Sequence, residues 1–202
     1  MADFSLEDEH DGVVCGLDEV GRGPLAGPVV AACVVIPKDK RTLEFIADIT
    51  DSKKLSAVKR EILYDQITMH FPHSIAEISP DEIDEINILQ ASLLAMTKAH
   101  DDVGNIDVAL VDGNRAPNLS SRIITVVKGD QKSKSIAAAS IIAKVHRDHI
   151  MQKLAKEHPY YGWETNAGYP TAQHKDALKT HGITLHHRKS FTPVRNVLNA
   201  KN

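Results

Sequence analysis

Short runs of apolar residues along the chain predict a set of strands. Two such runs open the sequence, and three more follow in its first two thirds. The last two runs each end in a glycine beside an aspartate, which is typical of a turn after a strand. The five predicted strands cover residues 13–20, 29–36, 73–79, 107–114 and 122–130.

Apolar residues at helical spacing predict helices between and after these strands. One helix should begin near Ser56, and a second should begin at Ser79-Pro80, where Glu82 completes a capping box. A long Ala-rich helix should occupy residues 134–158 and end before Pro159, and a last one should run from Thr171 to His181. Strands that alternate with helices predict an α/β fold in which helices cover a mixed sheet.

Composition fits one globular domain, because 42% of the 202 residues are hydrophobic and 25% are charged. No apolar run of about 18 residues predicts a membrane span, and the acidic start does not resemble a signal peptide. Cys15 and Cys33 lie inside predicted strands, where free buried thiols are favoured over a disulfide. We therefore expect a cytoplasmic protein.

The net charge of −3 hides an uneven distribution. Residues 1–127 carry 11 Lys and Arg against 22 Asp and Glu, whereas residues 128–156 carry 7 against 2 and residues 169–202 carry 6 against 1. A basic C-terminal third can offer a face that binds phosphates. Charge alone favours the alternative, in which the two parts are simply differently solvated surfaces.

Acids follow or interrupt three of the predicted strands. Asp18 and Glu19 lie in the first strand, Asp112 closes "ALVDGN", and Asp130 follows "VVKG". Acids at strand ends can converge in an α/β sheet, and carboxylates suit Mg²⁺ or Mn²⁺. Neighbours on a strand point to opposite faces, so Asp18 and Glu19 share an ion only if the strand bends or Glu19 uses its carbonyl. Ordinary turns remain an alternative for Asp112 and Asp130.

Seven blocks of the sequence resemble a known family. They run in order from about residue 14 to residue 195: "GLDEVGRGPLAGPVV", "DSKKLS", "LVDGNR", "VVKGD", "IAAASIIAKVHRD", "GYPTAQH" and "HHRKSFTPV". This order is similar to that of the type 2 ribonucleases H, specifically bacterial ribonuclease HII. The related ribonuclease HIII is a poorer match, since it usually carries a further N-terminal domain.

The resemblance implies a ribonuclease H-like fold, a mixed sheet flanked by helices with a helical C-terminal extension. We expect a flexible tail at residues 1–12, a catalytic core at residues 13–160 and an extension at residues 161–202 that contributes to substrate binding. The family is a metal-dependent endoribonuclease with Asp18, Glu19, Asp112 and Asp130 as catalytic and metal-binding residues. Two Mg²⁺ or Mn²⁺ ions are expected when substrate is bound.

The same resemblance implies the substrates. The family cleaves the RNA strand of RNA–DNA hybrids and nicks duplex DNA on the 5′ side of an embedded ribonucleotide, which leaves 3′-hydroxyl and 5′-phosphate ends. Gly21, Arg22 and Gly23 match the loop that reads the ribose 2′-hydroxyl, and Tyr169 matches the tyrosine that packs on the neighbouring sugar. Arg22 is also a candidate partner for an acid.

Basic side chains near the acids are candidates for phosphate contacts. The candidates are Lys53, Lys54, Lys128, Lys132 and Lys134. For the tract 186–189, His-His-Arg-Lys, we favour backbone-contacting or structural roles over a metal site, because adjacent histidines rarely share one ion. A role on the solvated surface is equally compatible with each lysine.

Three other function classes remain as alternatives. A binding module that keeps the fold would be favoured by loss of an acid, and all four acids are present. A phosphotransferase lacks its phosphate loop here, and a resolvase would act on all-DNA junctions. We expect a monomer that binds hybrids and ribonucleotide-containing DNA without a membrane; the sequence does not indicate whether replication factors recruit it.

Overall fold

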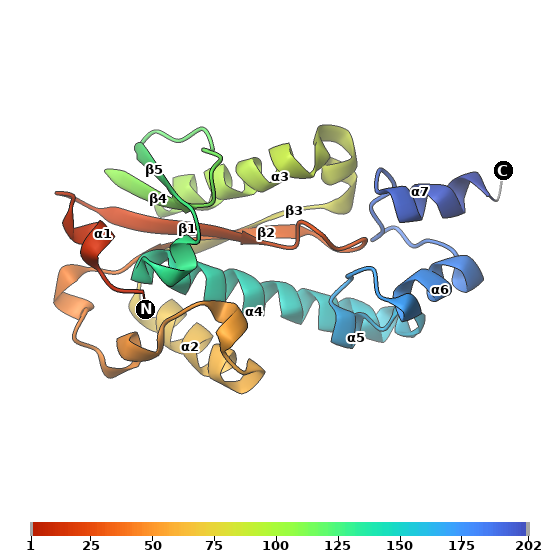
Figure 1. Cartoon of the computed structure of the whole chain (residues 1–202), viewed down its shortest axis with the longest axis horizontal. Coiled ribbons are helices and arrows are strands. Elements are labelled where there is room, and N and C mark those ends of the chain that lie inside the picture. Colours follow the sequence, from red (N-terminus) through yellow and green to blue (C-terminus); the bar gives the residue numbers. More distant parts are fainter. Residues whose placement is uncertain (1, 201–202) are drawn as a thin grey trace.

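A five-stranded mixed sheet forms the centre of the computed structural model, which describes residues 2–200 (Figure 1). The strands lie in the order β3-β2-β1-β4-β5. β1 pairs antiparallel with β2 and parallel with β4, and β5 continues the parallel half. The strands are β1 (Val14–Val20), β2 (Val29–Val35), β3 (His73–Ile78), β4 (Val108–Asp112) and β5 (Arg122–Val126). All five predicted strands are confirmed.

Helices cover both faces of this sheet. In Figure 1, α3 (Pro80–Val103) lies on one face and α4 (Lys134–Glu157) on the other, with α2 (Ala57–His70) packed against α4. Three shorter helices gather at one end of the molecule, around the C-terminal end of α4 (Figure 1). They are α5 (Trp163–Asn166), α6 (Ala172–His181) and α7 (Thr192–Asn199). None of the helices within residues 2–200 is both long and apolar enough to span a bilayer.

The predicted helix starts are confirmed by their caps. The side chains of Ser56, Ser79, Ser133 and Thr171 each accept a hydrogen bond from the backbone of the first helical turn. α3 is broken at Asn87, whose φ of 66° is not helical and whose side chain accepts from the amides of Leu89 and Gln90. This internal cap was not predicted from the apolar spacing.

A close approach of α4 to β1 fixes which face of the strand meets this helix. A Cβ on Gly16 would lie 2.1 Å from the backbone carbon of Ser135, so only glycine allows this contact. Alternation along the strand then places Asp18 on the same face as Gly16 and Glu19 on the face of α3. The first turn of α4 is thus seated directly beside the strand that carries two of the acids.

The N-terminal segment differs from the expected flexible tail. Residues Ser5–Asp8 form a short helix, α1, and Ala2 is buried. The buried carboxylate of Glu7 accepts hydrogen bonds from the Ser133 hydroxyl at 2.7 Å and from the Ser135 amide at 2.9 Å. A carboxylate at the start of a helix satisfies free amides and the helix dipole, which ties this segment to α4. Met1 of the predicted tail and residues 201–202 of the predicted extension lie outside the described residues.

Candidate active site

The four predicted acids line one cavity of about 300 Å³ at the carboxyl ends of the parallel strands. Asp18 lies near the end of β1, and Asp112 is the last residue of β4. Asp130 belongs to a 3₁₀ turn, η4 (Gly129–Gln131), that follows β5. The parallel pairing of β1, β4 and β5 brings together acids that are up to 112 positions apart in the sequence.

Asp18 and Glu19 reach the site from opposite faces of β1, as the strand alternation predicts. Glu19 lines the main cavity and also a second, smaller hollow that α3 helps to form. Asp112 lines both hollows as well. The site therefore straddles the end of the sheet, which lets neighbouring residues on one strand contribute without a bend in that strand.

The acids are held in mutual repulsion. Asp18 is 7% exposed, and burial together with the neighbouring carboxylates of Glu19 and Asp112 raises its pKa well above the ordinary value. Burial also raises the pKa of Glu19, and Asp112 adds to that effect. The Arg22 guanidinium, 3.4 Å from the Glu19 carboxylate, acts in the opposite direction. The loop arginine thus pairs with an acid of the site.

A fifth acid, Asp51, lies close to Asp130. Burial raises the pKa of Asp130, with Asp51 the next largest cause and Asp112 the third. Asp51 is itself buried and accepts a hydrogen bond from the backbone amide of Lys53. The Gly129 amide donates to Asp112 at 2.6 Å, which joins the end of β4 to the turn that carries Asp130.

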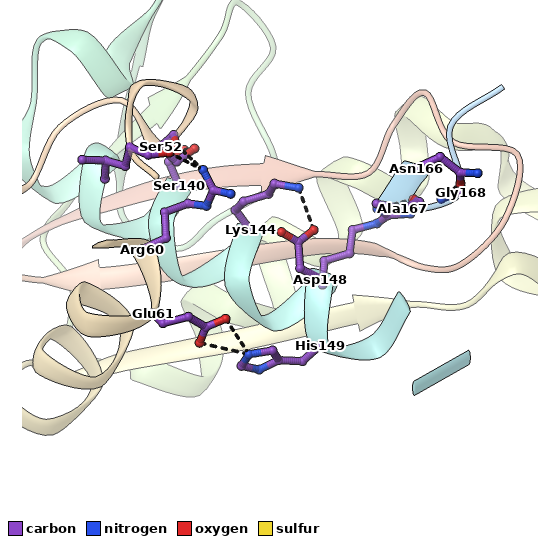
Figure 2. Close-up of polar contacts among 12 residues, drawn as sticks. Ser52, Arg60, Glu61, Ser140, Lys144, Asp148, His149, Asn166, Ala167 and Gly168 are labelled. Carbon is purple, nitrogen blue, oxygen red and sulfur yellow. Dashed lines mark hydrogen bonds and ion pairs between the residues drawn. The ribbon is translucent and has the colours of Figure 1, made fainter. Parts of the chain in front are cut away.

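Basic and hydroxyl side chains form one wall of the cavity. Lys53, Arg60 and Lys144 line it, together with Ser52 and Ser140, whose hydroxyl oxygens are 2.9 Å apart. Figure 2 shows Arg60 from α2 donating to the backbone around Ser52, and Lys144 paired along α4 with Asp148. The Lys144 ammonium lies 2.6 Å from the Asp148 carboxylate. The structure brings the predicted Lys53 to the site. Lys54 and Lys128 are exposed and do not line this cavity.

Arg188 supports the loop of Gly21, Arg22 and Gly23, which we call the glycine loop. Its guanidinium is fully buried and donates to the carbonyls of Gly21 at 2.6 Å, Arg22 at 3.1 Å and Gly27 at 2.9 and 3.0 Å. Burial, with the nearby Arg147, lowers its pKa to about 9, so it remains a cation at neutral pH. The C-terminal extension thereby fixes the loop that begins just after Asp18 and Glu19.

A second buried arginine, Arg147 of α4, completes this support. It donates to the carbonyls of Pro28, Ala167 and Ala26 at 2.9, 2.9 and 3.1 Å. A Cβ on Gly21 would lie 2.3 Å from the Arg147 side chain, so the loop closes over the guanidinium only with glycine there. Arg147 therefore connects the same loop to the segment that precedes Tyr169.

Tyr169 lies at the edge of the acidic cavity. Its side chain is 43% exposed, and a Cβ on Gly23 would meet its ring at 3.4 Å. Its backbone carbonyl accepts a hydrogen bond from His174, whose ring is in turn 3.1 Å from the buried His187. The predicted glycine loop and the predicted tyrosine are thus neighbours, held by the extension.

No three of the carboxylates at this site have oxygens within 4.8 Å of one another. Among residues 2–200, the one set of three His, Cys, Asp or Glu residues that meets this distance is Glu157, His158 and His186. Oxygens that bind one Mg²⁺ at about 2.1 Å can be at most about 4.2 Å apart. The four acids as placed therefore suit ions that each bind few carboxylates.

Several residues of the site carry no signal in their local sequence. Arg60 and Lys144 lie at positions that are ordinary for exposed residues of a helix. Arg147 and Arg188 bind carbonyls that are more than a hundred positions away in the sequence, except for that of Ala167. The quoted blocks "IAAASIIAKVHRD" and "HHRKSFTPV" contain Lys144, Arg147 and Arg188. Arg188 has a structural role, which is one of the two roles favoured for that tract.

Comparisons with known proteins agree with this geometry. The family model described as ribonuclease HII matches residues 15–194. A curated protein named ribonuclease HII from Paramagnetospirillum magneticum is 53% identical over 195 residues, which cover 96% of this chain and 97% of that protein. The fold matches the ribonuclease H2 structure from Pyrococcus horikoshii, with a TM-score of 0.75, 28% identity and coverage of 93% and 98%.

A second solved structure, RNase HII in complex with PCNA from Archaeoglobus fulgidus, matches with a TM-score of 0.71 and 26% identity. It covers 89% of this chain and 95% of that one. The mixed sheet, the flanking helices and these matches confirm the predicted ribonuclease H-like fold.

Proposed function

The chain belongs to the ribonuclease HII family of hydrolytic endonucleases, which act on the RNA of RNA–DNA hybrids, and from that premise we propose its finer activity. It requires a divalent metal ion, nicks duplex DNA on the 5′ side of an embedded ribonucleotide, and leaves 3′-hydroxyl and 5′-phosphate ends. Asp18, Glu19, Asp112 and Asp130 are the catalytic acids. The observation that carries this proposal is their convergence in one cavity beside the glycine loop.

The donor chemistry of the site supports Mg²⁺ or Mn²⁺ as the ion. All four ligand side chains offer oxygen, which both ions prefer. Burial and mutual repulsion raise the pKa values of Asp18, Glu19 and Asp130, and a bound cation would relieve this repulsion. When bound, two such ions supply an activated water and stabilise the leaving oxygen. We propose two ions and not one, because no three of these carboxylates have oxygens within 4.8 Å of one another.

The glycine loop supports recognition of the ribose. Arg188 occupies the carbonyls of Gly21 and Arg22, so these acceptors are turned into the protein. The amides of Arg22 and Gly23 have no hydrogen-bond partner within residues 2–200 and lie in an exposed part of the loop. We propose that these amides donate to the ribose 2′-hydroxyl, the group that distinguishes RNA from DNA.

Tyr169 and the basic wall support the position of the duplex. The exposed ring of Tyr169 lies beside Gly23, where it can pack on the sugar next to the ribonucleotide. Lys53 and Arg60 face the acids from η3 (Ser52–Lys54) and α2 and are suited to phosphate contacts. Lys54 and Lys128 remain proposed phosphate contacts outside the cavity, where a long duplex would pass.

The compartment, the oligomeric state and the partners complete the proposal. The two cysteines are free and buried, which supports a reducing compartment such as the cytoplasm. We propose that one copy of the chain is active by itself. A sliding clamp is the first partner to test, because the solved relative from Archaeoglobus fulgidus is a complex with PCNA.

Cleavage of a duplex that contains one ribonucleotide tests the proposal. The full chain is incubated with this duplex, an RNA–DNA hybrid and an all-DNA duplex, each with Mg²⁺, Mn²⁺ or EDTA, and the cuts are mapped at nucleotide resolution. We expect a metal-dependent nick 5′ of the ribonucleotide, an intact all-DNA control and loss of cutting in Asp112→Asn. Binding without cleavage would instead favour a binding module, and cleavage of an all-DNA four-way junction would favour a resolvase.

A further inference from the structure

A second set of ligating side chains lies away from the acidic cavity, where α4 ends. Glu157 is the last residue of α4, His158 caps it, and His186 belongs to the loop between α6 and α7. One ligating atom from each of the three residues lies within 4.8 Å of the other two. We propose that these residues form a transition-metal site, of the kind that takes Zn²⁺ or Co²⁺, distinct from the catalytic ions.

The ligand chemistry selects this class of ion. Two imidazoles and one carboxylate are a donor set that Zn²⁺ and its neighbours bind, commonly with water as a fourth ligand. Mg²⁺ prefers oxygen donors and is a poor match for two ring nitrogens. A phosphate could also meet two histidines, but the carboxylate of Glu157 would repel it. The mixed set therefore points to a cation.

The backbone that carries the ligands is already fixed on both sides. His158 leaves the helical conformation, as expected for a residue before proline, and its amide still donates to Leu154 at 2.9 Å. The His186 amide donates to the Thr184 hydroxyl at 3.2 Å, and its carbonyl accepts from Gly27 at 2.9 Å. Little reordering of the backbone is then needed when an ion binds, and rotation of the side chains brings the ligating atoms closer than the 4.8 Å limit.

The two rings face each other on an aromatic base. Their centroids are 5.3 Å apart in an edge-to-face arrangement, and the His158 ring packs in the same way on the fully buried Trp163 at 5.6 Å. These contacts restrict how the rings can turn. His158 and His186 are only partly buried and Glu157 is exposed, so an ion from solvent can reach them.

The three polar groups have no competing protein partners within residues 2–200. Six other histidines use a ring nitrogen in a hydrogen bond, including the exposed pair of His146 with Glu77 at 2.7 Å. The rings of His158 and His186 and the carboxylate of Glu157 make none. Groups that can ligate an ion and that converge without protein partners are what an ion site requires.

An ion at this position would join two parts of the molecule. Figure 1 places the end of α4 beside the C-terminal helices, and the loop of His186 continues directly into Arg188. The site would thus tie α4 to the segment that holds the glycine loop. We expect occupation to stabilise the fold without adding a step to the reaction, so the inference stands apart from the proposed catalytic function.

Co²⁺ titration of the full chain tests the site directly. The metal-free protein is kept in excess Mg²⁺, which occupies hard-oxygen sites, while the visible absorption of Co²⁺ is recorded. We expect a saturable band at one equivalent that Zn²⁺ displaces. His158→Ala and His186→Ala should each weaken binding roughly a hundredfold, since each removes one of three protein ligands. The same titration with Asp18→Asn should leave the band in place.

His146→Ala is the matched control, because it removes a histidine of α4 that is paired with Glu77 of β3. It should bind Co²⁺ like the unmodified chain. Zn²⁺ should also raise the melting temperature of the unmodified chain and of His146→Ala, but not of His186→Ala. Glu157→Gln, which keeps the shape of an exposed side chain, serves if a histidine variant fails to fold. An equal band in the histidine variants, or none in the unmodified chain, would overturn the proposal.

Discussion

Two regions of the molecule each contain buried groups of like charge. The two regions differ in whether these groups have partners within the protein. The acidic cavity holds Asp18 and Asp130, both 7% exposed, and their pKa values are raised because burial and neighbouring acids disfavour ionisation. The arginine pair, Arg147 and Arg188, is fully buried, yet its seven hydrogen bonds to backbone carbonyls are already made.

The difference separates support from function. A buried charge that has all its partners inside the protein stabilises one arrangement of the chain. A group of buried charges that repel one another is a site that a ligand of opposite sign completes. Because Arg188 binds the loop that follows Asp18 and Glu19, the satisfied region positions the unsatisfied one. Substitutions in the two regions should therefore have opposite consequences.

Neutralising one of the proposed catalytic acids should give the largest effect. Asp18→Asn keeps the shape of the side chain but removes a proposed metal ligand, so the single-turnover rate of nicking should fall by about a thousandfold or more. Its melting temperature should stay level or rise, because a buried negative charge is removed. Asp176→Asn, an exposed residue of α6, is the control. An unchanged nicking rate in Asp18→Asn would refute the metal assignment.

The arginine region should respond in stability. Arg188→Lys keeps the charge, but a single ammonium cannot reach the three carbonyls that the guanidinium binds. Urea unfolding should show a loss of about 3 kcal/mol in the free energy of unfolding, from hydrogen bonds to a charged group that are left unmade. The exposed Arg195→Lys should cost almost nothing. Equal losses in the two variants would show that the buried contacts have no special weight.

The same contrast explains what could be predicted from the sequence. Helix starts at Ser56 and Ser79 and the strand-end position of Asp112 depend on residues within a few positions of one another. The partners of Arg188 lie 161 to 167 positions away, beyond the reach of periodicity or capping. The resemblance to a family assigned roles to the acids and Tyr169. It did not indicate the backbone carbonyls to which Arg147 and Arg188 donate.

The positions of polar residues near the surface could be predicted least well from the sequence. Lys53 reaches the cavity because Asp51 caps its short turn, whereas its neighbour Lys54 points elsewhere. The segment 2–12 has the composition of a polar tail, but Glu7 binds the distant start of α4, and Ala2, Phe4 and Leu6 pack against the core. Sequence patterns record which residues are polar but not which of them find a partner.

Tyr169 lies between the two regions, and its loss should have an intermediate effect. Tyr169→Ala should reduce cleavage at a single ribonucleotide about tenfold more than cleavage of a long hybrid, since a hybrid offers other registers that do not need this sugar contact. Tyr169→Phe keeps the ring and should resemble the unmodified protein. Rates on both substrates under single-turnover conditions measure the ratio. Equal losses on the two substrates would remove the junction role.

The smallest effect should be a pH-dependent difference in stability between the unmodified chain and Asp18→Asn. The pKa of Asp18 is raised by burial and by Glu19 and Asp112, so the folded state holds its proton at pH values where the unfolded chain has released it. Stability from this group is therefore fully present below its unfolded pKa and is lost as pH rises through the folded value. The variant lacks this loss, so its advantage in melting temperature should grow from about pH 4 to pH 7.

Mg²⁺ should cancel that advantage at pH 7, because a cation bound to the ionised acids restores the stability that repulsion between them removes from the unmodified chain. Melting temperatures of both proteins at the two pH values, with and without Mg²⁺, give the comparison, and Asp176→Asn should show no pH-dependent difference. An advantage of Asp18→Asn that is constant in pH would mean that the acidic cavity is as well satisfied as the arginine pair. The distinction between an unsatisfied and a satisfied cluster would then fail at its most sensitive point.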